Sequence, residues 1–505
     1  MIQANADTAS DRATTGIPGL DAILGGGLPA GHMYLVEGDS GAGKTTLGLH
    51  FLLAGRQRGE TCLWITMSET ERELHAAARS HGWNLDGIHV LNLVLTREVL
   101  QTEEQYTFFS PADVELNDTT RQILDSVKSL APARVVFDPF SDIRHLARET
   151  LGYRRQILAL RDFFAEQNCT VLLMQEMTRG SSGDIQVEGL THGYMTLHQE
   201  SPEYGGQRRR IRVHKMRGIA FRDGFHDFAI ERGGIRVYPR LVPAEHYTDL
   251  PDETISTGLP ELDQLLGGGC ERGSSLLILG AAGVGKSSLA AQCAIAAAER
   301  GEKVLFFMFD ETVRAFTTRS RKLGWPLETH LSRGLIRLQQ IDTAQFSPGE
   351  FAQLVVDAVD GEGIQTIVID SLSGYINAMP EERFLASHMH ELLTFLTYKN
   401  VFTIMTLAQH GVLGEHVLSP VDLSYLADTV MLIRYFEAFG AIRRAISVVK
   451  KRSGPHEVLI REMLIRDGQG ISLGEPLRRF QGVLTGRPTF TGEEPIVDNA
   501  AKPQV

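Results

Sequence analysis

Cysteine is scarce in this chain, and the cysteines that occur form no pattern. Cys62, Cys169, Cys270 and Cys293 lie far apart along the 505 residues, and no two of them make a C-x-x-C pair. This spacing predicts neither a disulfide framework nor a zinc site. We expect the four thiols to be small residues of the core.

Long apolar runs and an excess of positive charge are also missing. No stretch of about 18 uncharged apolar residues occurs, and residues 1–12 lack the basic-then-apolar pattern of a secretory signal. We therefore expect a cytoplasmic protein that does not span a membrane. The 62 Asp and Glu residues outnumber the 50 Lys and Arg residues, for a net charge of -12. Since an acidic molecule repels phosphate backbones, nucleic acid is not the expected partner.

What the chain does contain is a repeat of its own sequence. Three segments recur with an offset of 242 residues: TGIPGLD from 15 and TGLPELD from 257, GGG from 25 and 267, and GDSGAGKT from 38 and GAAGVGKS from 280. Further along, the apolar run ending at Asp138 matches the run ending at Asp370, and 370 - 138 = 232. Such long offsets indicate two whole domains rather than a solenoid of short repeats.

Composition places the domain boundaries. A polar, proline-containing segment near 243–251 is typical of a linker. We expect an N-terminal tail at 1–13, a first domain at 14–248 and a second domain at 249–487. Residues 488–505 are polar and lack periodicity, so they are predicted to be a flexible tail.

Short apolar runs alternate with helical patterns in each half. The expected strands are 33–36, 62–65, 135–137 and 171–174 in the first half and 276–279, 304–309, 367–369 and 402–407 in the second. Continuous apolar strands separated by helices are typical of a parallel sheet covered on both faces. The predicted fold class is α/β, with two tandem P-loop domains, each a mostly parallel sheet flanked by helices.

Each half carries one G-x-x-x-x-G-K-[ST] loop between an expected strand and an expected helix. Its glycines let backbone N–H groups turn inward around phosphate, and its lysine reaches the β- and γ-phosphates of ATP. A glycine-rich turn with a solvated lysine is the alternative for one match, but two matches in register exclude it. The predicted nucleotide-binding residues are Gly38, Asp39, Ser40, Gly41, Ala42, Gly43, Lys44, Thr45 and Thr46, and Gly280, Ala281, Ala282, Gly283, Val284, Gly285, Lys286, Ser287 and Ser288.

Mg²⁺ is the second expected ligand. The hydroxyls of Thr45 and Ser287 would bind it directly, while Asp138 and Asp370, at the ends of apolar strands, would hold it through water. A helix N-cap is the alternative role for either aspartate.

Hydrolysis also needs a carboxylate that orients and deprotonates water. Glu69 in the first half and the pair Asp310 and Glu311 in the second follow the second strand. The alternative role is a capping acid, and Ser68-x-x-Glu71 also has the pattern of a capping box.

With these motifs in place, the chain resembles the KaiC family of RecA-like ATPases over roughly 14–488. The motifs that carry the resemblance are TGIPGLD and STGLPELD, each with a following GGG, and MSET, FDET, IVIDSLS, KMRG and KKRSGPH. The resemblance implies ATP and Mg²⁺ as ligands and a homohexameric ring with ATP at subunit interfaces. It also implies phosphate contacts from the neighbouring subunit through Lys215, Arg217, Lys450, Arg452 and His456, where the alternative is a set of solvated basic strand residues.

Departures from the family pattern qualify this expectation. The family has two adjacent glutamates after the second strand of each domain, whereas this chain has Ser68 and Asp310 at the first of the two positions. Hydrolysis in the first domain is therefore in question, and that domain would serve mainly to bind ATP. Phe221 also replaces a histidine of the family in the first domain.

The family phosphorylates itself on a neighbouring serine and threonine. Ser424 aligns with the serine, Tyr425 replaces the threonine, and Ser419 aligns with a nearby hydroxyl. Ser424 and Ser419 are thus candidate phosphoacceptors, and an ordinary helix or loop serine is the alternative. The expected function is a KaiC-like ATPase with serine/threonine autokinase activity in the C-terminal domain, acting as a slow switch or timer with a KaiB-like or signalling partner. A RecA-like DNA-dependent ATPase and a nucleotide-gated scaffold with little turnover remain as alternatives.

Overall fold

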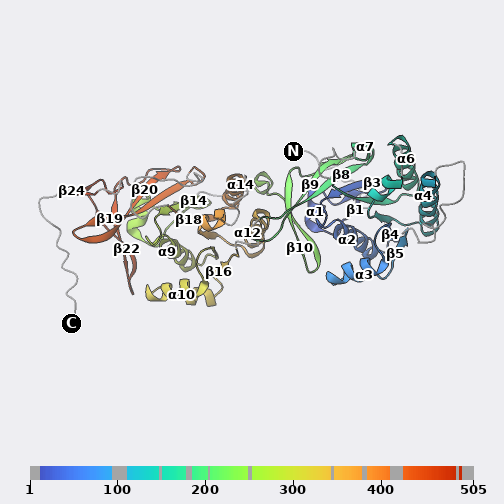
Figure 1. Cartoon of the computed structure of the whole chain (residues 1–505). Coiled ribbons are helices and arrows are strands. Elements are labelled where there is room, and N and C mark those ends of the chain that lie inside the picture. The colour runs from blue at the N-terminus through green and yellow to red at the C-terminus, as the bar shows by residue number, and fades with distance from the viewer. Residues whose placement is uncertain are drawn as a thin grey trace. The chain divides into compact units, whose positions relative to one another are not determined.

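The chain folds into two compact units in this computed structural model, Met1–Arg240 and Leu241–Val505 (Figure 1). The described residues are 12–93, 111–146, 150–177, 185–202, 205–247, 253–342, 346–377, 384–409, 425–484 and 488–491. Within these ranges, no helix is both long enough and apolar enough to cross a membrane.

The first unit is built on a nine-stranded sheet with the order β11-β10-β9-β8-β3-β7-β6-β4-β5. Strands β3 to β8 run parallel to one another, whereas β9, β10 and β11 are each antiparallel to the strand before them in the chain. Its strands are β3 (Met33–Gly38), β4 (Cys62–Thr66), β5 (Ile88–Asn92), β6 (Arg134–Phe137), β7 (Thr170–Glu176), β8 (Gly193–Glu200), β9 (Arg208–Met216), β10 (Phe225–Glu231) and β11 (Gly234–Tyr238), beside a small pair, β1 (Arg12–Ala13) and β2 (Leu28–Pro29).

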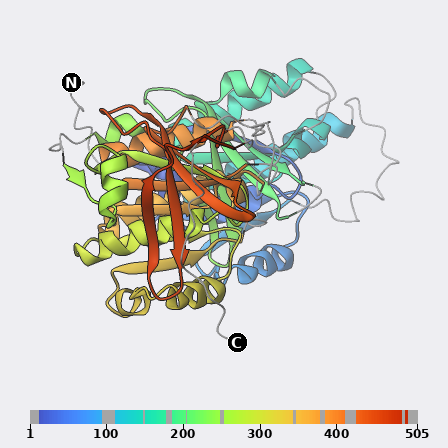
Figure 2. The same ribbon diagram turned by 90° about the vertical axis from the view of Figure 1, so that its left-hand side faces the viewer.

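The second unit repeats this sheet in the order β16-β15-β17-β18-β14-β19-β20-β21-β22, and Figure 2 shows its antiparallel strands in orange to red. Its strands are β14 (Ser275–Gly280), β15 (Val304–Met308), β16 (Ile336–Gln340), β17 (Thr366–Asp370), β18 (Phe402–Ala408), β19 (Thr429–Ala438), β20 (Ala441–Lys451), β21 (Arg461–Arg466) and β22 (Gly470–Pro476). Two small pairs accompany them, β12 (Thr254–Ile255) with β13 (Cys270–Glu271), and β23 (Phe480–Gln481) with β24 (Thr489–Phe490).

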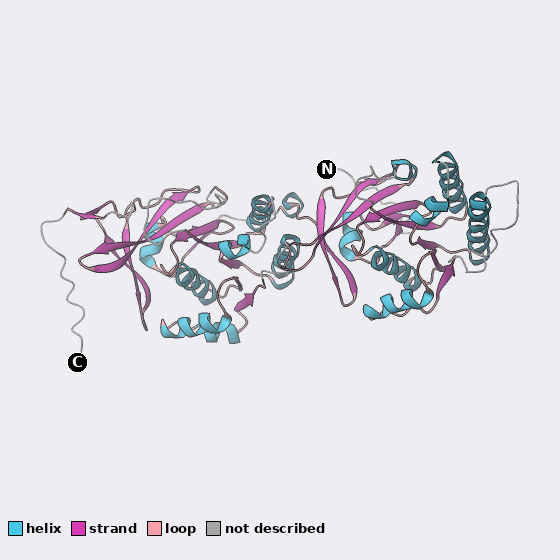
Figure 3. Ribbon diagram, in the orientation of Figure 1, coloured by secondary structure: helices cyan, strands magenta, loops and turns pink. Residues whose placement is uncertain are grey.

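Helices alternate with the parallel strands in both units (Figure 3). The first unit has α1 (Pro18–Ile23), α2 (Lys44–Gln57), α3 (Glu71–Ser80), α4 (Pro111–Leu130), α5 (Ser141–Leu146), α6 (Thr150–Glu166) and α7 (Ile185–Leu190). The second has the 3₁₀ helix η3 (Pro243–His246), α8 (Pro260–Leu265), α9 (Lys286–Glu299), α10 (Val313–Lys322), α11 (Leu327–Ser332), α12 (Pro348–Glu362), α13 (Leu372–Asn377) and α14 (Leu385–Tyr398).

Each sheet separates two apolar cores, because successive side chains of a strand point to opposite faces. In β14, Leu276 and Ile278 belong to one buried cluster and Leu277 to the other. In β3, Tyr34 and Leu35 divide in the same way. The prediction of two tandem α/β domains with mostly parallel sheets flanked by helices is therefore confirmed. The four cysteines are free and buried, as expected.

Candidate nucleotide sites

Both glycine-rich loops connect the end of a central strand to the start of a helix. Helix α2 begins at Lys44 and α9 at Lys286, directly after Gly43 and Gly285. These glycines have φ angles of 103° and 110°, in the left-handed region that favours glycine. A Cβ atom at Gly43 would lie 2.7 Å from Cδ1 of Ile230, so the loop needs glycine for space as well.

The loop lysines fold back onto their own loops. Nζ of Lys44 donates to the carbonyls of Gly38 and Asp39, both at 2.9 Å. Nζ of Lys286 makes the same two contacts one domain later, at 2.9 Å to Gly280 and 2.8 Å to Ala281. Burial lowers the pKa of both lysines, while Asp138 and Asp370 oppose that shift. Lys286 is buried and Lys44 is half-buried, and a loop curled around such a cation is the arrangement that fits a phosphate group.

The hydroxyl after each lysine meets the strand-end aspartate predicted from the sequence. Oγ1 of Thr45 donates to Asp138 at 2.8 Å, and Oγ of Ser287 donates to Asp370 at 2.9 Å. Burial raises the pKa of Asp138 to about 6 and also raises that of Asp370. The N-cap alternative does not hold for Asp370, because the backbone N–H of Gly374 is bonded to Ser371 instead.

This pairing of a hydroxyl and a carboxylate fits Mg²⁺. The described part of the chain holds no group of three or more His, Cys, Asp or Glu residues placed to bind a metal ion. Mg²⁺ with a nucleotide needs no such cage, since it keeps several waters and takes other oxygens from the phosphates.

Glu69 lies near Asp138 at the edge where β4 ends. Burial raises the pKa of Glu69, and the charge of Glu73 adds to the shift. The alternative of a capping box at Ser68-x-x-Glu71 does not hold: helix α3 is capped by Thr70 and Glu73, which exchange hydrogen bonds. The capping box lies two residues later because the chain first turns at Thr66, whose hydroxyl accepts a hydrogen bond from the N–H of Glu69.

The second domain holds its two carboxylates with specific partners. Asp310 accepts a hydrogen bond from Oγ of Ser371, and Glu311 forms an ion pair with Arg319 at 2.7 Å. Sequence reasoning did not find Arg319. Its counterpart in the first domain is Ala77 (319 - 242 = 77), so the repeat pattern gives no signal for it.

The basic residues predicted to contact a neighbour's phosphates bind carbonyl groups of their own chain. Nζ of Lys215 donates to the carbonyls of Glu188 and Thr191 at 2.6 and 2.8 Å, and Nζ of Lys450 donates to Ala427 at 2.8 Å.

The remaining predicted contacts lie on the same strand ends or just beyond them. Arg217 donates to the carbonyl of Gly189 at 3.2 Å, and Arg452 forms an ion pair with Asp428 at 3.5 Å. His456 lies beside Gly267, whose added Cβ would be 3.6 Å from the histidine Cα. Ser419 and Ser424 lie outside the described residues.

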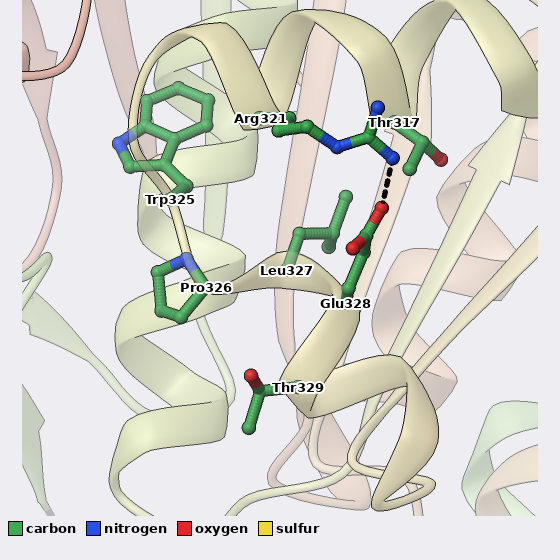
Figure 4. Close-up of a pocket in the computed structure, with 7 residues that line it drawn as sticks. All are labelled: Thr317, Arg321, Trp325, Pro326, Leu327, Glu328 and Thr329. Atoms are coloured by element: carbon green, nitrogen blue, oxygen red, sulfur yellow. Dashed lines mark hydrogen bonds and ion pairs between the residues drawn. The ribbon is translucent and has the colours of Figure 1, made fainter.

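A separate hollow of about 230 Å³ lies between α10 and α11 (Figure 4). An ion pair between Arg321 and Glu328 crosses it, and Trp325 closes one side. No residue of the two phosphate loops lines this hollow.

Two sheets of one order, each with a lysine-bearing phosphate loop at the end of a central strand, define a tandem RecA-like nucleotide-binding protein. The sequence model of the family described as "ATPase: KaiC" matches residues 13–242 and again 255–478. The chain belongs to the KaiC family of ATPases.

Several curated relatives cover nearly the whole chain. The "Circadian clock protein KaiC3" of Synechocystis is 26% identical over 517 residues, which covers 96% of each protein. The "Circadian clock oscillator protein KaiC" of Parathermosynechococcus lividus is 26% identical over 94% of this chain and 87% of its own length. The protein of the same name from Synechococcus elongatus is 25% identical over 94% of this chain and 91% of its own length.

Proposed function

We propose that the chain binds Mg-ATP in both domains and hydrolyses it, with the second domain the faster. The observation that carries this proposal is the recurrence of one arrangement: a loop lysine, the next hydroxyl and a buried strand-end aspartate. The two sites share this geometry although they lie 242 residues apart in the sequence.

In the second domain, different residues bind the phosphates, hold Mg²⁺ and orient the attacking water. Lys286 neutralises the terminal phosphates, and Ser287 with Asp370 holds Mg²⁺. Mg²⁺ supplies charge neutralisation of the phosphate oxygens when bound. Glu311, assisted by Asp310, orients the attacking water and takes its proton. The ion pair with Arg319 uses Oε1 of Glu311, and we assign this role to the other carboxylate oxygen, Oε2.

Turnover measured on the purified protein tests the proposal. ADP release from ATP should depend on Mg²⁺ and should fall to background in the variant Lys44→Ala/Lys286→Ala. Hydrolysis that persists in this double variant would place the activity outside the two loops.

We further propose a homohexameric ring in which Lys215, Arg217, Lys450, Arg452 and His456 reach the phosphates of the neighbouring subunit. Support comes from the recurrence of basic residues at and just beyond the ends of the matching antiparallel strands β9 and β20, together with family membership. Charge on a transferring phosphoryl group needs such neutralisation. Mass measurement with and without Mg-ATP is the test, and a monomer under both conditions would discard the ring.

Autophosphorylation of Ser424, used as a slow switch or timer with a KaiB-like or signalling partner, is the finer proposal. It rests on the family alignment of Ser424 and on relatives whose names describe clock proteins. Protein incubated with γ-labelled ATP should carry label that disappears in Ser424→Ala and persists in Ser419→Ala. Label that remains intact in Ser424→Ala would remove this site.

Two other functions make different predictions. A DNA-dependent motor would be stimulated by single-stranded DNA, and the net charge of -12 argues against it. A nucleotide-gated scaffold would retain ATP without measurable turnover, a behaviour that Ser68 favours for the first domain only.

A further inference from the structure

The first domain lacks a carboxylate where the second has Asp310. Ser68 stands at that position, since 310 - 68 = 242 is also the offset between β4 and β15. The hydroxyl that binds Asp310 has disappeared as well: Ser371 corresponds to Pro139, because 371 - 139 = 232. Proline offers no side-chain donor. An aspartate at position 68 would therefore have lost the partner that fixes it.

A complementary exchange occurs on the opposite side of this contact. In the second domain, a Cβ added to Gly374 would lie 2.8 Å from Oδ1 of Asp310 and 2.5 Å from Cβ of Phe309. Glycine is thus required while the carboxylate of Asp310 lies there. The first domain carries Asp142 at this position (374 - 142 = 232) and the small Ser68 opposite. Each domain thus has one aspartate at this pair of aligned positions, Asp142 in the first and Asp310 in the second.

The strand register shows that these positions correspond in space as well as in sequence. Cys62 of β4 pairs with Arg134 of β6, and Val304 of β15 pairs with Thr366 of β17. Both pairs are separated by the same two offsets, 304 - 62 = 242 and 366 - 134 = 232. The segments that follow these strands therefore leave the two sheets at matching points.

The environment of Asp142 agrees with a place in the site. Its side chain is half-buried in the first turn of α5. Burial is the main cause of the raised pKa of Asp138, and the charges of Glu69 and Asp142 lie near enough to add to that shift. Asp138 accepts the hydrogen bond from Thr45, so Glu69 and Asp142 both lie near the carboxylate that the loop hydroxyl contacts.

We propose that Asp142 replaces Asp310 in the first domain, where it orients the attacking water together with Glu69. This inference rests on the proposed ATPase function. The water oxygen forms a bond to the terminal phosphorus, and the bond from that phosphorus to the oxygen bridging to ADP breaks. The water proton passes to Glu69, and ADP leaves with the electron pair of the broken bond. The first domain is then a hydrolytic site rather than a nucleotide store.

The test uses the full chain with the second site silenced by Lys286→Ala. In this background, Asp142→Asn should lower ATP turnover about tenfold or more, since a positioned carboxylate contributes at least that much. Moving the carboxylate back by Ser68→Asp, Pro139→Ser and Asp142→Gly together recreates the second-domain arrangement. This triple change should restore turnover to within about threefold of the parent, a recovery that a merely structural Asp142 does not predict.

Controls separate folding and the wider proposal from this inference. Asp142→Asn should keep the ATP affinity and melting temperature of its parent, and Asp162→Asn, a change at an exposed ion pair with Arg161, should keep its turnover. Unchanged turnover in Asp142→Asn, or a loss that the triple change does not repair, overturns the inference. If Lys286→Ala protein is inactive while Lys44→Ala protein hydrolyses ATP, the first domain is no hydrolytic site; this inference then fails, while the proposed ATPase activity of the second domain stands. If both single variants and the unaltered chain are inactive, the proposed function fails instead.

Discussion

The two nucleotide domains share a sheet order and a loop geometry but surround the loop with different charges. In the second domain Asp370 accepts hydrogen bonds from Ser287 and Thr406. In the first, Met174 replaces Thr406 (406 - 174 = 232), and Asp138 accepts from Thr45. A hydroxyl that donates to a buried carboxylate stabilises its charged form and lowers its pKa, so two donors favour ionisation more than one.

The two domains also differ in the positive charge beside the carboxylate that follows the second strand. Arg319 neutralises Glu311 in the second domain, whereas its counterpart Ala77 offers Glu69 no charge. In the first domain Glu69 and Asp142 lie near Asp138, and burial together with these two charges raises the pKa of Asp138 to about 6. A duplicated scaffold has thus kept its phosphate loops while the groups that tune them diverged. We expect the two sites to differ in rate more than in affinity.

Replacing each loop lysine in turn should give the largest difference in ATP turnover between the two domains. Lys286→Ala should lower total ATP turnover about 100-fold if the second domain is the faster, because it removes charge that a transferring phosphoryl group requires. Lys44→Ala should lower it by less than about twofold. Turnover is measured as phosphate release at saturating Mg-ATP. Equal losses in the two variants would break the asymmetry.

Arg134 marks a difference in stability rather than rate. It is 1% exposed, pairs with Glu60 and donates to the carbonyl of Phe51 at 2.9 Å. Its counterpart in the second domain is Thr366, and the matching acid, Glu302, is bound by other arginines. Arg134→Met should destabilise the first domain by about 3 kcal/mol, because Glu60 loses its buried partner.

Tryptophan fluorescence can report this loss for one domain alone. Of the three tryptophans, Trp64 and Trp83 belong to the first domain, so urea unfolding is followed in a Trp325→Phe background. Adding Glu60→Leu to Arg134→Met should recover most of the lost stability, since the unpaired charge is then gone. A loss that Glu60→Leu does not reduce would show that packing, not the ion pair, is responsible.

The sequence alone predicts the scaffold and the phosphate loops because these depend on local patterns. Apolar runs such as 62–65 and 304–309 can be buried on both sides only in a sheet that is covered on both faces. The strand predicted at 304–309 is β15, which ends at Met308, one residue earlier than expected. Gly43 and Lys44 stand in a motif whose spacing fixes their geometry.

The surroundings of the loops could not be predicted in this way. Arg319 follows Glu311 by eight residues and Asp142 follows Asp138 by four, but only the packing of α10 and α5 decides which neighbours these side chains meet. The cap of α3 is a further example: Ser68-x-x-Glu71 and Thr70-x-x-Glu73 both have the pattern of a capping box, and only the turn at Thr66 selects Thr70.

Arg319 offers a smaller and sharper change within the second domain. In a Lys44→Ala background, Arg319→Gln should reduce turnover about tenfold, because Glu311 loses the ion pair that holds it at the site. Arg314→Gln, a change on the same helix, is the matched control and should have little effect. Phosphate release and ATP affinity are compared for both variants. A drop in affinity at constant turnover would assign Arg319 to binding rather than to positioning Glu311.

The smallest expected effect concerns acid stability, where His50 of the first domain corresponds to Gln292 (292 - 50 = 242). Nε2 of His50 accepts the backbone N–H of Ile235 at 2.8 Å, and burial lowers the pKa of His50 to about 4. The unfolded chain takes up this proton near pH 6.5 and the folded domain only near pH 4, so stability is lost as pH falls between these values. His50→Gln should abolish about 1 kcal/mol of that loss, since glutamine can still accept the bond without titrating. The measurement is the urea midpoint of the Trp325→Phe protein, with and without His50→Gln, at pH 7 and at pH 4.5. If the midpoint falls by the same amount between these pH values in both proteins, groups other than His50 cause the loss of stability in acid.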